Sequence, residues 1–162
     1  MRLDRFDTKI VAELQRNGRL SVVELAELIG LSATPCARRV KTLESAGVIE
    51  GYGAIVNPPK IGLSILAMVQ VKLVAHTDET VTRFEEEISR LDEVTNCFAL
   101  TGAFDFMLQV YTKDLETLGN VVLKKLMRIP GVRDLQSSVV LETIKRSARV
   151  PLGHLSEKAA GE

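Results

Sequence analysis

Cysteines, long apolar runs and an apolar leader are scarce or missing in this chain of 162 residues. The two cysteines, Cys36 and Cys97, lie far apart, whereas a disulfide framework or a zinc site needs more ligands at closer spacing. No apolar run is long enough to span a membrane, because Lys72 interrupts the longest stretch. The N-terminus carries Asp4 and Asp7 and has no apolar segment of the signal-peptide kind. These absences predict a reduced, cytoplasmic protein without a membrane partner.

An excess of charge of one sign is also missing. The 21 Lys and Arg residues balance the 21 Asp and Glu residues, so a nucleic acid could be met only by a local basic patch. Apolar residues make up 46% of the chain and charged residues 26%, which is ordinary for a globular protein and excludes general disorder. The length allows one or two domains with a real core.

The first 50 residues predict three short helices. Asp4 begins the first helix, and Asn17-Gly18 ends it. Ser21 and Glu24 have the spacing of a capping box at the start of the second. Gly30 ends that helix, and Ser32 begins a third, which runs to about Ala46 and is ended by Gly47. Two β-prone pieces around a glycine then predict a small wing hairpin over residues 48–56.

The second half alternates between the two kinds of hydrophobic periodicity. Strands are expected at about 64–74, 95–101, 104–110 and 135–144, and amphipathic helices at about 81–91 and 115–129. The order β-α-β-β-α-β is the ferredoxin-like pattern, in which both helices cover one face of the sheet. The fold class is therefore α+β. We expect a winged helix-turn-helix at 1–56, a Pro-containing linker at 57–63, a ferredoxin-like domain at 64–152 and a tail at 153–162.

The expected third helix has two distinct sides. Cys36, Val40 and Leu43 recur at helical spacing and predict its buried side. The opposite side carries short polar and basic residues, which suit guanine edges and phosphates in a major groove. The helix N-terminus also offers N–H groups to a phosphate. We predict DNA contacts from Ser32, Thr34, Pro35, Arg38, Arg39, Lys41 and Ser45.

Several motifs resemble those of the Lrp/AsnC family of bacterial and archaeal transcriptional regulators. They are LDRFD at 3–7, LQRNGR at 14–19, GLSATPCARRV at 30–40, GAFDF at 102–106 and PGV at 130–132. Their order and spacing match the family over about residues 3–152. The resemblance implies an N-terminal winged helix-turn-helix and a C-terminal ferredoxin-like effector domain, often called RAM. It also implies sheet-to-sheet dimers that assemble further, often into octamers, with an amino acid bound between dimers.

The resemblance further implies an effector site. Gly102 and Asp105 match the family's Gly-Asp-Phe-Asp-Tyr turn, whereas Ala103 and Phe106 replace its first Asp and its Tyr. A glycine lets the backbone approach a ligand closely, and Asp105 could accept a hydrogen bond from an α-ammonium group. The effector-binding positions are Ala99, Gly102, Ala103, Asp105, Leu115, Ser138, Val139 and Val140. Because these are mostly apolar or small, we expect leucine, methionine or another apolar amino acid as effector.

For several of these residues a purely structural role remains an open alternative. Asp105 could serve only to fix its turn, Cys36 could be a small core residue, and a basic helix face could simply be solvated. His76 and His154 have no second ligand at metal spacing, so no metal site is expected. No cluster of acid, base and nucleophile predicts catalysis, and no cofactor is expected.

The sequence thus predicts a sequence-specific regulator that binds duplex DNA and responds to a small molecule. Two alternatives come from other classes. A small enzyme on a ferredoxin-like fold would need reactive groups that this chain does not cluster. A metabolite-sensing oligomer acting without DNA would leave the basic face of the third helix unused.

Overall fold

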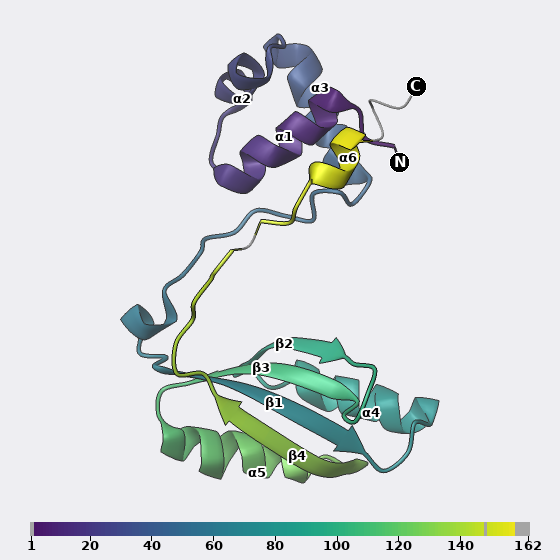
Figure 1. The fold of residues 1–162 in the computed structure, drawn as a ribbon, viewed down its shortest axis with the longest axis vertical. Coiled ribbons are helices and arrows are strands. Elements are labelled where there is room, and N and C mark those ends of the chain that lie inside the picture. Colours follow the sequence, from purple (N-terminus) through teal and green to yellow (C-terminus); the bar gives the residue numbers. More distant parts are fainter. Residues whose placement is uncertain (1, 148, 158–162) are drawn as a thin grey trace. The chain divides into compact units, whose positions relative to one another are not determined.

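The computed structural model describes residues 2–147 and 149–157, and of Val121, Ser156 and Glu157 the backbone alone (Figure 1). The chain forms two compact units. The first unit combines the N-terminal residues up to Ile55 with the C-terminal residues from Lys145, and the second unit is Val56–Ile144. In the part of the chain that is described, no helix is both long and apolar enough to cross a membrane.

The first unit contains the three expected helices: α1 (Arg5–Arg16), α2 (Val22–Ile29) and α3 (Ala33–Ser45). The capping box predicted for α2 is confirmed, since Ser21 accepts from the Glu24 N–H and Glu24 accepts from the Ser21 N–H. Asp4 and Asp7 form a second capping box at the start of α1. One apolar cluster joins the three helices, with buried members Ile10, Val11, Leu25, Ala26, Ile29, Cys36 and Leu43.

The predicted wing hairpin at 48–56 is wrong in this structure, where these residues form no strands. A short isolated two-stranded ribbon is only marginally stable in water, and these residues have no third strand beside them. The segment is held to α3 instead, because the Tyr52 hydroxyl donates to Glu44 Oε1 at 3.0 Å.

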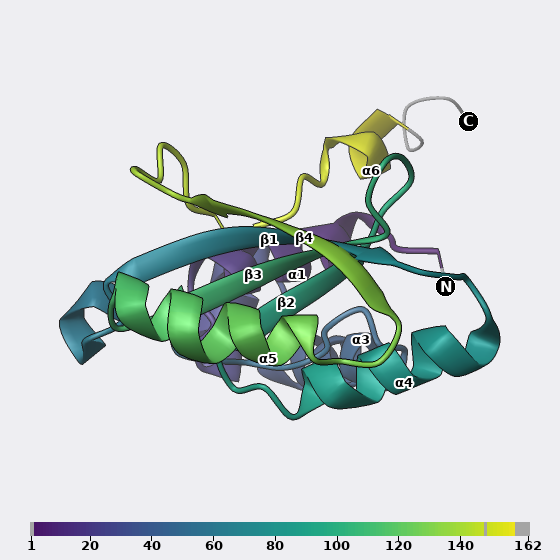
Figure 2. The ribbon, with the colours of Figure 1, turned by 90° about the horizontal axis from the view of Figure 1, so that it is seen from below.

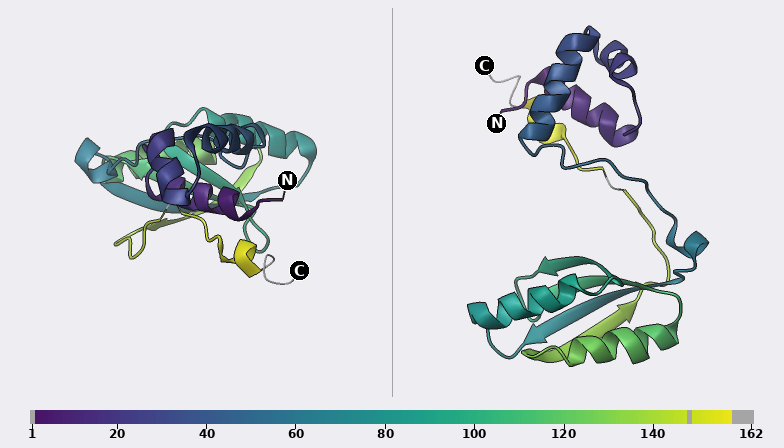
Figure 3. Two further views of the ribbon diagram at one scale, coloured as in Figure 1. Left: turned by 90° about the horizontal axis from the view of Figure 1, so that it is seen from above. Right: turned by 180° about the vertical axis from the view of Figure 1, so that it is seen from behind.

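The second unit is a four-stranded antiparallel sheet in the order β2-β3-β1-β4. Its strands are β1 (Ile65–Leu73), β2 (Val94–Ala99), β3 (Phe106–Thr112) and β4 (Val132–Val139). Helix α4 (Asp78–Ser89) follows β1, while the π-helical segment η2 (Thr117–Leu123) and α5 (Lys124–Met127) follow β3. Figures 2 and 3 show α4 and α5 on the same face of the sheet. The ferredoxin-like fold class is confirmed.

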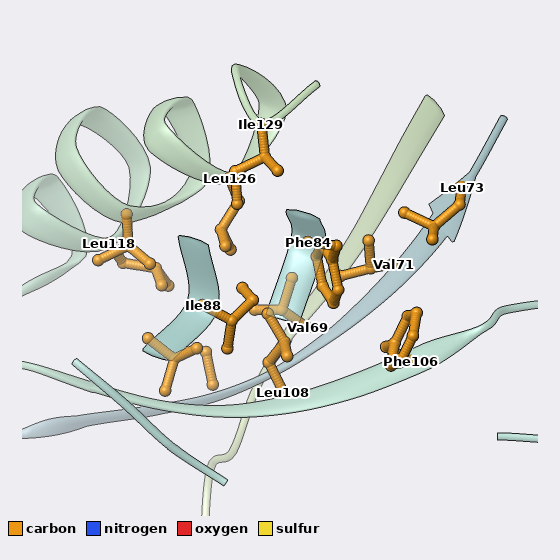
Figure 4. Close-up of a cluster of buried hydrophobic side chains, with 13 residues drawn as sticks. Val69, Val71, Leu73, Phe84, Ile88, Phe106, Leu108, Leu118, Leu126 and Ile129 are labelled. Carbon is orange, nitrogen blue, oxygen red and sulfur yellow. The ribbon is translucent and has the colours of Figure 1, made fainter. Parts of the chain in front are cut away.

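The core of this unit lies between the sheet and those helices (Figure 4). Val69, Val71 and Leu108 point into it from the central strands, because alternate strand residues share one face. Phe84 of α4 is fully buried, and its ring centroid lies 4.6 Å from that of Phe106. The alternate residues of β1 and β3 form the opposite face, to which neither α4 nor α5 contributes.

The two units begin and end at other residues than the sequence predicted. A 3-10 turn, η1 (Pro58–Ile61), occupies the predicted linker. Strand β4 ends at Val139 rather than near residue 144, and the chain from Lys145 groups with the first unit rather than with the ferredoxin-like unit. Part of the predicted tail is the helix α6 (Gly153–Glu157), which lies beside α1 (Figures 1 and 3). Residues 158–162 of the predicted tail lie outside the described residues.

Candidate DNA-binding and ligand-binding sites

The turn between α2 and α3 presents α3 as the second helix of a helix-turn-helix. Gly30 has φ +76°, a left-handed conformation that costs a glycine little, and the Leu31 N–H donates to Ala26 O at 2.9 Å. Only three residues, Gly30, Leu31 and Ser32, lie between the end of α2 and the start of α3. Cys36 and Leu43 are fully buried, which confirms the predicted inner side of α3.

The outer side of α3 is exposed, as the spacing predicts. The exposed members of the predicted DNA-binding set are Ser32, Thr34, Arg38, Lys41 and Ser45. In contrast to Ser21, Ser32 makes no side-chain capping bond, so its hydroxyl is free of that role. Within the described part of the chain, neither Arg38 nor Lys41 forms an ion pair. This face can therefore offer two unneutralised cations to a phosphate or a guanine.

The structure gives Arg39, another residue of that set, a different environment. Its Nη1 lies 2.7 Å from Asp7 Oδ1 and 2.8 Å from Asp4 Oδ2, and its guanidinium lies 5.4 Å from the Phe6 ring centroid. We call these four residues the Arg39 clamp. The hydrogen bond to Asp7 raises the pKa of Arg39. The clamp ties α3 to the first turn of α1, so Arg39 is not part of the free cationic face. Pro35 is half-buried in the first turn of α3.

Asp4 is stabilised as a carboxylate in this clamp. Partial burial acts to raise its pKa, but hydrogen bonds from the Asp7 and Phe6 N–H groups and from Arg39 lower it overall. Sequence reasoning missed the clamp, because a basic residue on the flank of a recognition helix has the same pattern whether it faces DNA or a neighbouring helix. The available signal was an acidic pair at the start of α1, namely Asp4 at the N-cap and Asp7 in the first turn.

The predicted effector turn joins β2 to β3. Gly102 has φ +130°, a conformation that favours glycine, and a Cβ placed there would meet nothing within 4 Å. Gly102 and Ala103 are exposed, as is Ala99 at the end of β2. The backbone of the turn can therefore be approached from outside.

Asp105 is buried at the base of this turn, and its carboxylate is occupied. Oδ2 accepts from the Leu73 N–H at 2.7 Å, and Oδ1 lies 3.3 Å from Lys72 Nζ and 3.1 Å from His76 Nε2. Burial acts to raise the pKa of Asp105, but the Leu73 hydrogen bond and the two basic neighbours lower it overall. These contacts match the structural alternative, in which Asp105 fixes the turn to the end of β1. Lys72 and His76 had no sequence signal for this role.

The predicted effector residues fall into two groups at opposite ends of the sheet. The turn residues lie at the C-terminal end of β1, where the Asp105 N–H donates to Val71 O. Val139 pairs with Ala67 near the other end of β1, Ser138 with Met68, and Val140 donates to Leu66 O. Leu115 follows β3, whose end pairs with Ile65. Six residue steps along the strand, about 20 Å, lead from Ala67 to Leu73, so one copy of the chain cannot bring both groups around one small ligand.

The remaining candidates show no reactive arrangement. Cys36 is buried, and burial raises the pKa of its thiol, as the core alternative requires. Cys97 is exposed on β2. Among the residues that the structure describes, no three His, Cys, Asp or Glu side chains gather as a metal site.

Known proteins resemble the chain in both halves. The family profile described as "Lrp/AsnC ligand binding domain" matches residues 66–150, and "Winged helix-turn-helix DNA-binding" matches residues 3–50. The leucine-responsive regulatory protein of Escherichia coli K12 is 38% identical over 148 residues, which are 91% of this chain and 90% of that protein.

Solved structures resemble the fold closely. A transcriptional regulator of Neisseria meningitidis, solved in complex with L-methionine, is 40% identical, with a TM-score of 0.89, 94% coverage of this chain and 99% of that chain. An AsnC family transcriptional regulator of Agrobacterium tumefaciens is 32% identical, with a TM-score of 0.88 and the same coverages. These relatives are regulators rather than enzymes, which excludes the enzyme alternative. The chain belongs to the Lrp/AsnC family of DNA-binding transcriptional regulators with a ligand-binding domain.

Proposed function

We propose that the protein reads specific duplex sequences through the outer side of α3. The observation that carries this proposal is the exposed face with Arg38 and Lys41, both without a partner among the described residues, on the second helix of a helix-turn-helix. Thr34 and Ser45 extend the same face by about one helical turn in each direction. In a two-fold dimer, two such helices would enter successive major grooves of a partly palindromic site.

Selection from a random duplex library, followed by binding titrations, tests this reading. A consensus with two related half-sites is the expected result. Binding that shows no sequence preference at any salt concentration would contradict it and would favour the alternative of a metabolite sensor that acts without DNA.

We also propose an apolar amino acid as the effector, with L-methionine as the first candidate. Two observations support this choice: the relative from Neisseria meningitidis was solved with L-methionine, and the predicted site residues include Leu115, Val139 and Val140. An amino acid also carries a carboxylate, to which backbone N–H groups near Gly102 can donate hydrogen bonds. A thermal-shift screen of the twenty amino acids tests this, since a ligand that binds the native state raises the apparent melting temperature.

Assembly into dimers and then octamers completes the proposal. The sheet face opposite α4 and α5 carries Leu66, Met68, Met107 and Tyr111 alongside polar residues, and a second sheet could cover it. Because the two groups of effector residues lie too far apart within one copy, a shared pocket would combine groups from different copies. Sedimentation of residues 60–147 should give at least a dimer, and a stable monomer would contradict the pairing of sheets. Such a regulator would act in the cytoplasm, where it meets DNA.

A further inference from the structure

The C-terminal residues contact helix α1 of the DNA-binding unit through a pair of hydrogen bonds between one backbone residue and one side-chain amide. Val150 donates its N–H to Gln15 Oε1 at 2.6 Å, and its carbonyl oxygen accepts from Gln15 Nε2 at 3.3 Å. A side-chain amide carries both donors and an acceptor, so it can pair with the N–H and the C=O of a single residue. Gln15 therefore pairs with Val150 much as a neighbouring strand residue would.

Two residues further on, the contact becomes apolar. Leu152 packs against the cluster that joins α1, α2 and α3, together with Leu14 and Ile49. Pro151 between them favours an extended Val150, and residues i and i+2 of an extended segment point the same way. The chain then turns into α6, where the Leu155 N–H donates to Leu152 O at 3.0 Å.

The seat of this segment is part of a groove on the first unit. The groove has a volume of about 410 Å³ and is lined by Val11, Leu14 and Gln15 of α1, by residues 48–52, and by Val150 itself. The match to the winged helix-turn-helix profile ends at residue 50, so residues 150–157 lie outside it. We call residues 150–157 the C-terminal strap.

Helix α1 is thus held at two places. The strap engages its C-terminal half at Leu14 and Gln15. The Arg39 clamp engages its first turn and connects it to α3. Any tilt of α1 released by loss of the strap would be passed to α3 through this ion-paired connection and through the shared core.

We propose that the C-terminal strap is a working part of the DNA-reading unit, and that Gln15 and Leu152 are positioning residues that fix α3 through α1. The proposal rests on the DNA reading proposed above. Sequence discrimination depends on side chains of α3 meeting base edges at short range, whereas non-specific binding depends on charge. Loss of the strap should therefore lower discrimination and leave non-specific affinity in place.

Two variants of the full-length protein test the strap. Gln15→Met keeps the length of the side chain and removes both hydrogen bonds, and Leu152→Ala removes the apolar anchor. His154→Ala is the matched control, because His154 is an exposed residue of the same segment. Affinities for the duplex selected with the wild type and for a random duplex are measured at equal salt and at 10 °C, with helicity checked by circular dichroism. Hydrogen exchange of the α1 amides is measured in parallel.

We expect both variants to exchange α1 amides at least fivefold faster and to lose at least fivefold in the ratio of selected to random affinity. Affinity for random duplex should stay within twofold, and His154→Ala should match the wild type in all readouts. Faster exchange with an unchanged ratio would reduce the strap to a stabilising role and overturn the proposal, as would unchanged values throughout. If Leu152→Ala does not fold, Gln15→Met decides alone. A wild type without preference for any duplex would instead count against the proposed DNA reading.

Discussion

The two units present their functional residues in opposite ways. In the DNA-binding unit, the predicted contacts lie along one side of a single helix, whose buried side is fixed by a core of its own. In the ligand-binding unit, the predicted contacts are divided between the β2–β3 turn and the far end of β1 and β4. A helix face is a local property of the sequence, since every third or fourth residue meets there. A site divided over a sheet depends on pairing and on assembly.

The largest effect on stability is expected from a substitution in the core of one unit, compared with the core of the other. Phe84→Ala should destabilise the ligand-binding unit by about 3–5 kcal/mol, because the ring is fully buried against Phe106. The cores of the two units are separate, so the α1–α3 amides should keep their protection from hydrogen exchange. Leu115→Ala, at a residue 60% exposed, is the control in the same unit and should change little. Equal loss of protection in both units would show that they unfold together.

The sequence predicted this separation well where periodicity alone decides structure. The stripes Cys36/Leu43 on α3 and Val69/Val71 on β1 are buried as their spacing indicates. Prediction failed where a segment's partner lies far along the chain. The hairpin expected around Gly51 has no third strand beside it in the described structure. Val150 finds its partner in Gln15, 135 residues away. The sequence also placed Arg39 on the DNA-contacting face and missed its ion pairs with Asp4 and Asp7, for a related reason. The spacing of residues along a helix does not say whether its flank faces solvent or a neighbouring helix.

Two adjacent arginines sharpen the comparison within α3. Arg38→Ala should cost about 1–3 kcal/mol of affinity for the selected duplex and leave stability unchanged, because Arg38 is exposed and unpaired in the described structure. Arg39→Ala should cost about 1–2 kcal/mol of unfolding free energy, because it leaves the buried Asp7 carboxylate without its cation.

Urea unfolding and duplex titration of both variants check this contrast. The Arg39 side chain is about a third exposed, so solvent screening keeps the expected cost below that of a fully buried pair. A stable Arg39→Ala protein with a large loss of DNA affinity would return Arg39 to the DNA-contacting face.

A smaller effect is expected from pH on the ligand-binding unit. The pKa of Asp105 is lower when folded than its ordinary value of about 3.9. Asp105 therefore contributes its full stabilisation above about pH 4, and this contribution is lost as the pH falls through the lower folded pKa. Asp105→Asn keeps an acceptor for the Leu73 N–H but cannot titrate. In urea unfolding followed from pH 6 to pH 3, the stability advantage of the wild type over Asp105→Asn should shrink toward acid. An advantage independent of pH would mean that the carboxylate charge does not hold the turn.

The smallest expected effect concerns Lys41, whose loss should lower the affinity for DNA only slightly and should be seen mainly in the salt dependence of that affinity. Lys41 is exposed on the outer side of α3, next to the turn of the helix that carries Arg38. As a flexible point charge it suits a phosphate, so Lys41→Ala should weaken binding to all duplexes alike and reduce the slope of log affinity against log salt by about one. Lys9→Ala removes the same charge from an exposed position on α1 and should leave the slope unchanged. If Lys41→Ala instead changed the selected sequence, Lys41 would read bases, and the division of labour between Arg38 and Lys41 would have to be reversed.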